Sequence, residues 1–325
     1  MHPAQAPHDP DSVRIVFEAM ASPCEIVLSK NPQRDLEGAA RQAIAEVQRI
    51  EARYSRYRSD SIVARINAAA GGAAVDCDDE TWSLLEFAQS LYQSSDGLFD
   101  ISAGVLRTVW DFKAAQVPSA AALEAVRSLI GWPMVERHNK TVRLSHAGMQ
   151  IDFGGFGKEY AADRAGAVLE KNGLRHGYVN LGGDIRVIGP RPDGRPWTFG
   201  IQDPRDPNKL VASIPMTSGG LATSGDYVRY FETEGKRYCH VLHPQTAMPV
   251  SYWRSVSVMA PFAVVAGNCA TITMLKEENG LEFLENTGVG YLAISHTGEV
   301  FTSTSPSHHR EPNYLSLENL NANLC

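Results

Sequence analysis

The sequence predicts an α+β fold in which helices and strands form one two-lobed unit. Segments with helical spacing of apolar residues are interspersed along the chain with short strand-like segments. A chain of 325 residues with 43% hydrophobic residues can bury one large core or two lobes. Because no repeat, low-complexity tract or proline-rich linker divides it, we expect one domain over residues 13–306. A disordered N-terminal tail, residues 1–12, and a C-terminal tail, residues 307–325, are expected to flank it.

The individual elements follow from the spacing of apolar residues. Alternation predicts strands, and apolar residues three or four positions apart predict helices. The expected elements, in order, are paired strands at 13–19 and 24–28 around a turn at Ala21-Ser22-Pro23, helices at 35–54 and 81–93, a helix that begins at Pro118-Ser119 and ends at Gly131, short strands within 133–144, a strand at 256–259 and a largely buried helix at 264–275.

A glycine-rich segment in the middle of the chain carries the strongest functional signal. A short apolar strand is expected to end at Asp152 and to open into the loop 154–157, Gly-Gly-Phe-Gly. Lys158 then begins a helix that ends at Gly173. Glycines let a backbone approach a ligand closely, and a lysine at a helix N-terminus adds positive charge to the favourable end of the helix dipole. This arrangement predicts that the loop holds phosphate.

A second glycine turn follows the next predicted strand, residues 177–181, and reads Gly182-Gly183-Asp184. Neither loop has the Gly-Lys-Ser/Thr ending of a P-loop or the G-x-G-x-x-G of a dinucleotide-binding fold. Taken alone, each loop is typical of an ordinary turn at the end of a strand. Two such loops with an acid and a lysine within about forty residues favour the phosphate-binding interpretation.

Charge and cysteine content narrow the function classes. The formal net charge of −7 provides no basic field for nucleic acid, so an anionic ligand must be held by local loops. The five cysteines are scattered and odd in number, which argues against a disulfide framework or a zinc site. The first residues show no signal peptide, and no apolar run approaches membrane-spanning length. We therefore expect a cytoplasmic protein with no membrane or nucleic-acid partner.

Six segments in the same order resemble the conserved blocks of the ApbE family of flavin transferases, which move FMN from FAD onto a Ser or Thr of a partner protein. The resemblance extends over nearly the whole chain. The segments are Met20-Ala21-Ser22-Pro23, 57–67 (YRSDSIVARIN), 97–104 (GLFDISAG) with Trp110, the glycine-rich segment 149–189, 223–231 (TSGDYVRYF) and 240–244 (HVLHP).

The resemblance implies an α+β, ApbE-like fold, FAD as substrate, Mg²⁺ as cofactor and an acceptor protein as partner. It implies that His240 belongs to the transfer site, where a base near neutral pKa can deprotonate the acceptor hydroxyl. The residues that it places against FAD are Met20, Tyr57, Leu98, Phe99, Asp100, Asp152, Lys158, Thr223, Ser224 and Leu242. For the metal, it implies the Gly155 carbonyl and the side chain of Thr271.

Departures from the family pattern gather at the same site. The family places an Asp one helical turn before the Thr, and this chain has Gly267 there. The Gly that usually follows the loop lysine is Glu159, and His243 replaces an acid. The metal ligand is therefore either relocated or lost, and a Gly267→Asp change is expected to be tolerated unless the glycine serves close packing.

Several residues also have structural interpretations. Asp152 is typical of a residue that caps a turn, Asp163 could pair with a surface cation, and Tyr57 and Met20 could belong to the core. At the level of function, the leading hypothesis is an FAD:protein FMN transferase. The alternatives are a non-catalytic FAD-binding protein and an Mg²⁺-dependent FAD pyrophosphatase that releases FMN and AMP.

Overall fold

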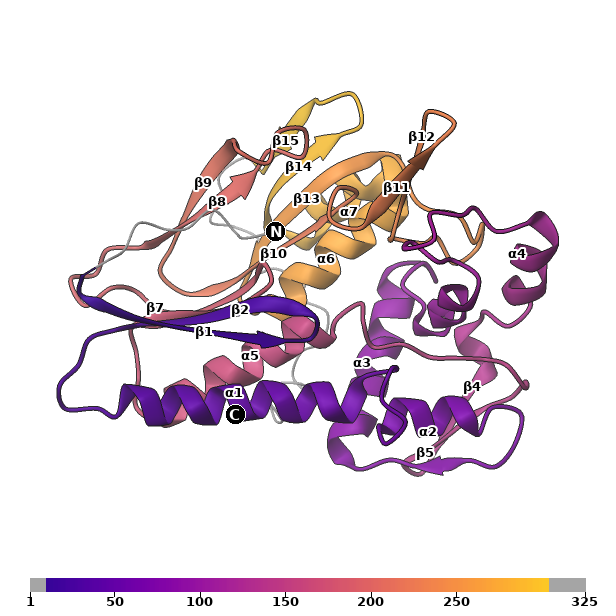
Figure 1. The fold of residues 1–325 in the computed structure, drawn as a ribbon, viewed down its shortest axis with the longest axis horizontal. Helices are drawn as coiled ribbons and strands as arrows, with labels where there is room; N and C mark the ends of the chain where they lie inside the picture. The colour runs from indigo at the N-terminus through magenta and orange to yellow at the C-terminus, as the bar shows by residue number, and fades with distance from the viewer. Residues whose placement is uncertain (1–9, 304–325) are drawn as a thin grey trace.

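The fold is built around an antiparallel sheet of eight strands, in the order β1-β2-β6-β7-β10-β13-β14-β15 (Figure 1). A computed structural model describes residues 10–303. The strands of this sheet are β1 (Ser12–Ala19), β2 (Ser22–Ser29), β6 (Gly177–Leu181), β7 (Asp184–Gly189), β10 (Gly219–Gly225), β13 (Trp253–Ala260), β14 (Gly290–Ser295) and β15 (Val300–Thr302). Every neighbouring pair of strands is antiparallel.

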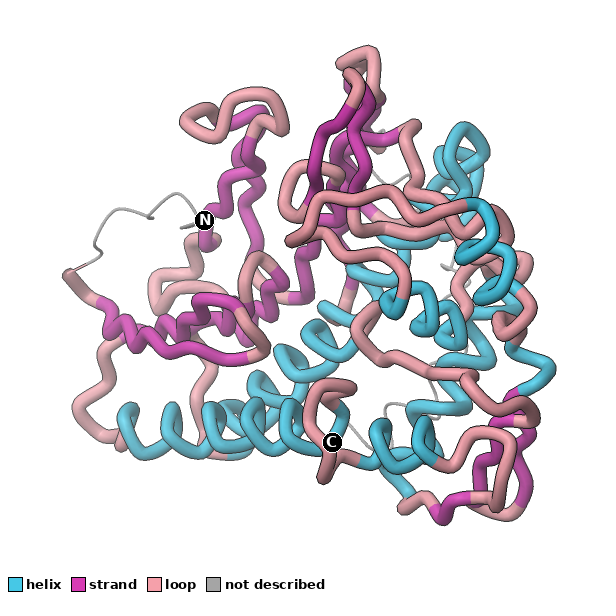
Figure 2. The backbone as a smooth tube through the Cα atoms, turned by 45° about the vertical axis from the view of Figure 1, so that its right-hand side comes forward, coloured by secondary structure: helices cyan, strands magenta, loops and turns pink. Residues whose placement is uncertain are grey.

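Helices cover one face of the sheet and a hairpin covers the other. Tyr178 and Val179, neighbours in β6, belong to two different hydrophobic clusters, because successive side chains of a strand point to opposite faces. The helices on the first face are α1 (Leu36–Tyr54), α5 (Gly157–Lys171), α6 (Ala263–Lys276) and α7 (Gly280–Thr287), and the hairpin is β8 (Trp197–Gln202) with β9 (Leu210–Met216). Figure 2 shows the helices along one side of the strands.

A second group of elements lies beyond the end of this sheet, at the right of Figure 1. It comprises α2 (Ile62–Ala68), α3 (Asp79–Ser94), the 3-10 helices Ile101–Thr108 and Trp132–Met134, α4 (Ala120–Arg127) and a small sheet of β3 (Val75–Asp76), β4 (Val135–His138) and β5 (Thr141–Leu144). The main hydrophobic core continues from this group into the helices under the large sheet. A last hairpin is formed by β11 (Tyr230–Thr233) and β12 (Lys236–Cys239).

The structure confirms the α+β class and most of the predicted elements. The predicted helix at 35–54 is α1, capped by the Asp35 side chain, and the helix expected after Lys158 is α5, followed by Gly173 in the left-handed region. The predicted helix after Ser119 ends earlier than expected, at Arg127. Most of the two predicted tails lies outside the described residues.

Two predictions of local structure are wrong. The first hairpin turns at Met20 and Ala21, which both have positive φ, while Ser22 and Pro23 already belong to β2. The residues before Asp152 form no strand. Among the described residues, no helix is both long and apolar enough to cross a membrane.

Candidate functional site

The chain entering the glycine-rich loop is held by side chains instead of a neighbouring strand. Asn67 of α2 accepts a hydrogen bond from the Ile151 amide at 2.7 Å and donates one to the Ile151 carbonyl at 3.0 Å. The Asp152 amide donates to the Ile101 carbonyl at 2.9 Å. These bonds satisfy the extended backbone that the apolar pattern predicted to lie in a sheet.

Asp152 fixes the start of the loop. Its Oδ1 accepts a hydrogen bond from the Gly154 amide at 2.8 Å, and its Oδ2 lies 3.3 Å from Nη1 of Arg56. The structural interpretation of Asp152 as a turn cap is therefore confirmed, and its contact with FAD stays a prediction. Arg56 also donates to the Gly104 carbonyl at 2.6 Å, which connects the loop to the 97–104 segment.

Buried aromatic residues pack against the glycine-rich loop. Phe156 is fully buried, with its ring 5.1 Å from that of Phe153 and 6.4 Å from that of Phe99. A Cβ on Gly155 would lie 2.9 Å from Cζ of Phe99, so the loop needs glycine at this position. Phe99 is thus a buried support for the Gly155 backbone.

The N-terminus of α5 has no cap from the Phe156 side chain. The Gly157 amide donates to the Phe153 carbonyl at 2.7 Å and the Glu159 amide to its own carboxyl group, which leaves the Lys158 amide of the first turn. A Cβ on Gly157 or on Gly183 would meet no atom within 4 Å. An anion can therefore approach the positive end of the helix dipole between the two glycine turns.

Lys158 is paired with Asp184, the acid of the second glycine turn. The Lys158 Nζ lies 3.1 Å from Oδ2 of Asp184, and Asp184 raises the pKa of the lysine. This carboxylate explains a cation at the start of a helix without any bound anion. Ser22, next to the Met20 turn, packs against Gly182 and brings the β1–β2 hairpin to the same place.

Glu159 points from α5 towards α6 and is buried, with 9% of its surface exposed. A Cβ on Gly267 would lie 2.4 Å from Oε1 of Glu159, so the carboxyl group occupies the space next to this glycine. Burial and the charge of Asp184 raise the pKa of Glu159 well above its usual value, and Lys158 opposes the shift.

Asp163, one turn after Glu159, fixes the relative position of α5 and α6. Its two oxygens accept hydrogen bonds from the amides of Ala263 and Val264, each at 2.9 Å. Asp163 therefore caps α6 from another helix, although it is only 3% exposed. It also lies 3.9 Å from Nε of Arg186, so the expected pairing with a cation is present beside the cap. Since Asp163 meets the start of α6 and Glu159 meets Gly267, the two helices run antiparallel.

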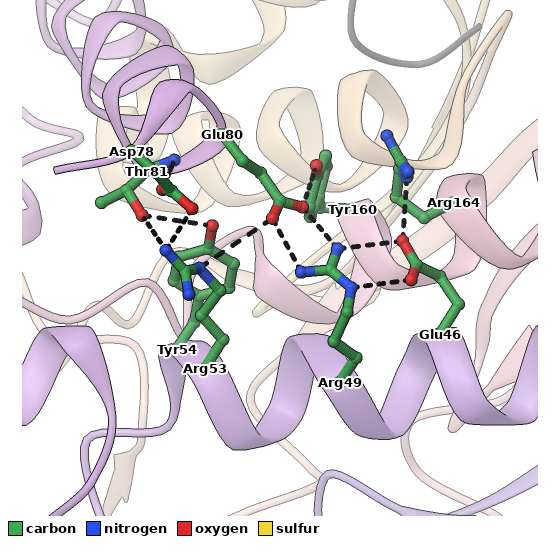
Figure 3. Close-up of polar contacts among 9 residues, drawn as sticks. All are labelled: Glu46, Arg49, Arg53, Tyr54, Asp78, Glu80, Thr81, Tyr160 and Arg164. Atoms are coloured by element: carbon green, nitrogen blue, oxygen red, sulfur yellow. Dashed lines mark hydrogen bonds and ion pairs between the residues drawn. The ribbon is translucent and has the colours of Figure 1, made fainter.

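A polar network holds α5 against α1 and α3 (Figure 3). Arg49 of α1 donates to both oxygens of Glu80, at 2.8 and 2.7 Å, and to Glu46 at 2.7 Å. Tyr160 of α5 donates to Glu80 at 2.8 Å, and Arg164 donates to Glu46 at 3.1 Å. Tyr160 thus anchors the first turns of α5 and leaves the neighbouring Glu159 facing α6.

The TSG segment at the end of β10 lies against α6. Ser224 Oγ is 2.9 Å from Oγ1 of Thr271, and Thr223 Oγ1 is 2.8 Å from Oγ of Ser257 in β13. Thr271 lies one helical turn after Gly267 on the same face of α6. Ser224 of β10 and Glu159 of α5 therefore contact the same face of α6, at Thr271 and at Gly267 respectively.

His240 follows β12 and lies among cations. Burial and the charges of Arg107, Arg229 and Lys158 lower the pKa of His240 to about 3. Its buried Nδ1 has no hydrogen-bond partner within residues 10–303. The imidazole is thus neutral at ordinary pH and has a nitrogen free to contact a ligand.

The turn after His240 is closed by His243. Its Nδ1 accepts from the amides of Gln245 and Thr246 at 3.3 and 3.4 Å, a capping role that an Asp could also fill. Leu242 pairs with Pro249 across this turn. His243 and Leu98 line a cavity of about 680 Å³, whose lining does not include the glycine loops.

The remaining predicted residues occupy different surroundings. Asp100 caps a 3-10 helix, accepting from Ser102 and from the Trp132 amide at 2.9 Å. Tyr57 is 84% exposed and is not a core residue, whereas Met20 packs partly buried against the main core. The contact of Asp100, Tyr57 and Met20 with FAD stays a prediction.

Arg107, Arg229 and Asp184 were missed as site residues by the sequence reasoning. Arg107 donates to the His240 carbonyl at 3.3 Å, and it interacts electrostatically with Asp152. Nothing in the local pattern around either arginine marks it. Asp184 was visible as the acid of the second glycine turn, and its position beside Lys158 became clear only from the fold.

The chain is similar to known flavin transferases in sequence and in structure. An FAD:protein FMN transferase of Treponema pallidum is 33% identical over 266 residues, covering 75% of this chain and 73% of that protein. One of Escherichia coli K12 is 28% identical over 258 residues, covering 76% and 74%. The crystal structure of the ApbE protein of Thermotoga maritima superposes with a TM-score of 0.85 at 29% identity, covering 90% of this chain and 97% of that one. The sequence pattern of the ApbE family matches residues 20–293, and the chain belongs to this family.

Proposed function

We propose that this chain is an FAD:protein FMN transferase. The acceptor hydroxyl, from a Ser or Thr, attacks the phosphorus of the FMN half of FAD. The bond from that phosphorus to the bridging pyrophosphate oxygen breaks, and AMP leaves. The proposal is supported by the names of the relatives and, in this molecule, by one observation: a neutral histidine with a free, buried Nδ1 lies among cations that include Lys158 of the glycine loop.

The positive groups around the loops account for binding. Lys158, Arg107 and Arg229 all act on His240 electrostatically, so the three positive charges lie near the same side chain. The positive end of the α5 dipole, with the Lys158 amide, adds to this region. A molecule with a net charge of −7 can therefore hold a pyrophosphate at a locally positive site.

His240 is the group that takes the proton of the acceptor hydroxyl. With a pKa of about 3 in the free protein it is a weak base. A bound pyrophosphate places negative charge beside the same three cations, which reduces their effect and raises the basicity of the ring. FAD binding thus makes His240 a stronger base, and the histidine takes the proton after FAD has bound.

Oxygen ligands for Mg²⁺ are available, although no group of three His, Cys, Asp or Glu side chains with metal-binding geometry occurs within residues 10–303. Mg²⁺ commonly uses one or two protein oxygens together with substrate phosphates and water. The Thr271 hydroxyl and the Gly155 carbonyl are the predicted protein ligands. When bound, Mg²⁺ would neutralise charge on the transferring phosphate.

One incubation tests the proposal against its two alternatives. Purified protein is mixed with FAD, Mg²⁺ and an acceptor-domain protein, and the products are separated by denaturing gel and chromatography. Flavin fluorescence on the denatured acceptor, with AMP in solution, supports the transferase. AMP and free FMN without labelling would identify a pyrophosphatase, and unchanged FAD would identify a binding protein.

A further inference from the structure

The carboxyl group of Glu159 fills a space that the sequence leaves empty on α6. A Cβ on Gly267 would lie 2.4, 2.6 and 2.8 Å from Oε1, Cγ and Cδ of Glu159, well inside contact distance. Any side chain at position 267 would therefore displace that of Glu159. The Glu159 side chain can occupy this space only because position 267 is glycine.

Glu159 has no partner among the other side chains that the structure describes. Its carboxyl group accepts a hydrogen bond from its own backbone amide and feels the charge of Lys158, and only 9% of its surface is exposed. Lys158, the nearest lysine in sequence, is paired with Asp184 at 3.1 Å. A buried carboxyl group that no other side chain contacts by a hydrogen bond has oxygen lone pairs left for a ligand.

The neighbouring hydroxyl identifies the kind of partner. Thr271 lies one turn along α6 from Gly267 and on the same face, so its Oγ1 faces the side on which Glu159 lies. The Thr271 hydroxyl has one donor hydrogen and two lone pairs. Its hydrogen bond with Ser224 Oγ, at 2.9 Å, uses one of these, so at least one lone pair is left for a cation. Carboxylate and hydroxyl oxygens together suit a hard divalent cation.

We propose that Glu159 supplies, from α5, the carboxylate ligand for a divalent cation whose second side-chain ligand is Thr271 of α6. Asp163 and Tyr160 act as positioning residues, because they fix α6 and the first turns of α5 relative to each other. The cation is of the Mg²⁺ or Mn²⁺ class, and its remaining positions are free for water or phosphate oxygens. This inference rests on the proposed function for its biological role, although cation binding can be measured separately.

The exception stated for Gly267→Asp applies, because this glycine does serve close packing. The new side chain would enter the space of Glu159 and place two carboxylates in one volume. The single variant should therefore bind the cation no more tightly than the natural protein. The double variant Glu159→Gly with Gly267→Asp places the acid on α6 instead of α5. It removes the clash and keeps one carboxylate in the same space.

The test is a titration of the full-length protein with Mn²⁺ alone, in which electron paramagnetic resonance reports free Mn²⁺. Glu159→Gln should weaken Mn²⁺ binding by roughly tenfold or more, as expected for loss of a charged ligand. Glu170→Gln, at the other end of the same helix, is the matched control and should bind as the natural protein does. The double exchange should recover most of the affinity.

Unchanged Mn²⁺ affinity in Glu159→Gln would overturn the inference, as would failure of the folded double exchange to bind Mn²⁺. Thermal unfolding identifies a variant that does not fold, in which case the double exchange decides. If the natural protein transferred no FMN but Glu159→Gln lost Mn²⁺ binding, the cation site would be supported and the proposed function contradicted. If the natural protein transferred FMN but Glu159→Gln bound Mn²⁺ normally, the proposed function would be supported and the cation site contradicted.

Discussion

Lys158 shows that a side chain can serve the fold and a ligand at once. Its position before a glycine-rich helix predicted an anion, and the structure supplies one in Asp184, 3.1 Å away. The pair is only partly buried, with 32% of the lysine side chain exposed, so the ammonium group can still meet solvent or a phosphate. Asp184 keeps the lysine charged and holds it between the two glycine turns.

Replacing Lys158 by alanine should therefore weaken FAD binding. A charge-assisted hydrogen bond contributes about 1.5–3 kcal/mol, which corresponds to roughly a 10- to 150-fold higher Kd. Isothermal titration with FAD, without Mg²⁺, measures this directly. Lys171→Ala, at the exposed C-terminal end of the same helix, should leave the Kd unchanged. An unaltered Kd in Lys158→Ala would reduce the lysine to a partner of Asp184.

His240 carries the second prediction at this scale. His240→Ala should leave FAD affinity within a few-fold and slow transfer by roughly 10²–10⁴-fold, the usual contribution of a general base. Single-turnover kinetics of acceptor labelling separate the two quantities. If binding and transfer fell together, His240 would be a ligand contact and not the base.

The same histidine predicts a dependence of stability on pH. Its pKa in the folded protein is about 3, below the ordinary 6.5, so the unfolded chain binds the proton more readily. Its contribution to stability is complete above pH 6.5 and is lost progressively as pH falls towards 3. Urea unfolding across this range should therefore be less pH-dependent in His240→Gln than in the natural protein. If the free energy of unfolding changed equally with pH in both proteins, the pKa of His240 would not be lowered by folding.

At the scale of elements, α5 connects most of the parts of the site. It begins at the glycine loop, carries Lys158 beside Asp184 and Glu159 beside Gly267, and caps α6 through Asp163. Tyr160 and Arg164 join it to α1 and α3 through Glu80 and Glu46 (Figure 3). A displacement of this one helix would move every one of these groups.

The cap of α6 provides the prediction for this scale. Asp163→Ala removes two buried acceptors from the first amides of α6 and should lower the free energy of unfolding by about 2 kcal/mol, the upper part of the range for caps. Asp35→Ala removes the exposed cap of α1 and serves as the control, with an expected loss of about 0.5–1 kcal/mol. Urea unfolding measures both. Equal losses would show that burial adds nothing to the Asp163 cap.

Most elements could be predicted because their evidence is local. The spacing of apolar residues and the caps at Asp35 and Ser119 mark α1 and α4, and glycine marks the end of α5. The strand predicted before Asp152 is wrong because its apolar residues are buried in the main core without a neighbouring strand, and Asn67, 84 residues away, bonds the Ile151 backbone instead. A local pattern reports burial and does not tell which partner provides the hydrogen bonds.

At the scale of the whole molecule, the site depends on contacts between distant segments. Glu159 and Gly267 lie on different helices, and their complementarity follows only from the antiparallel packing of α5 and α6. In the same way, Arg107 and Arg229 reach His240 from two other segments. The glycine loops were predicted from the residues themselves and the histidine from the resemblance, whereas Arg107, Arg229 and the Glu159–Gly267 pair were found only in the fold.

The whole account depends on transfer of FMN to a protein, and intact mass spectrometry of the acceptor tests this most directly. The acceptor is incubated with this protein, FAD and Mg²⁺, beside an acceptor whose target Ser or Thr is replaced by Ala. The account predicts a gain of one FMN phosphoester on the natural acceptor, equimolar release of AMP, and no gain on the Ala variant. Consumption of FAD with AMP release and no gain of mass on either acceptor would contradict it.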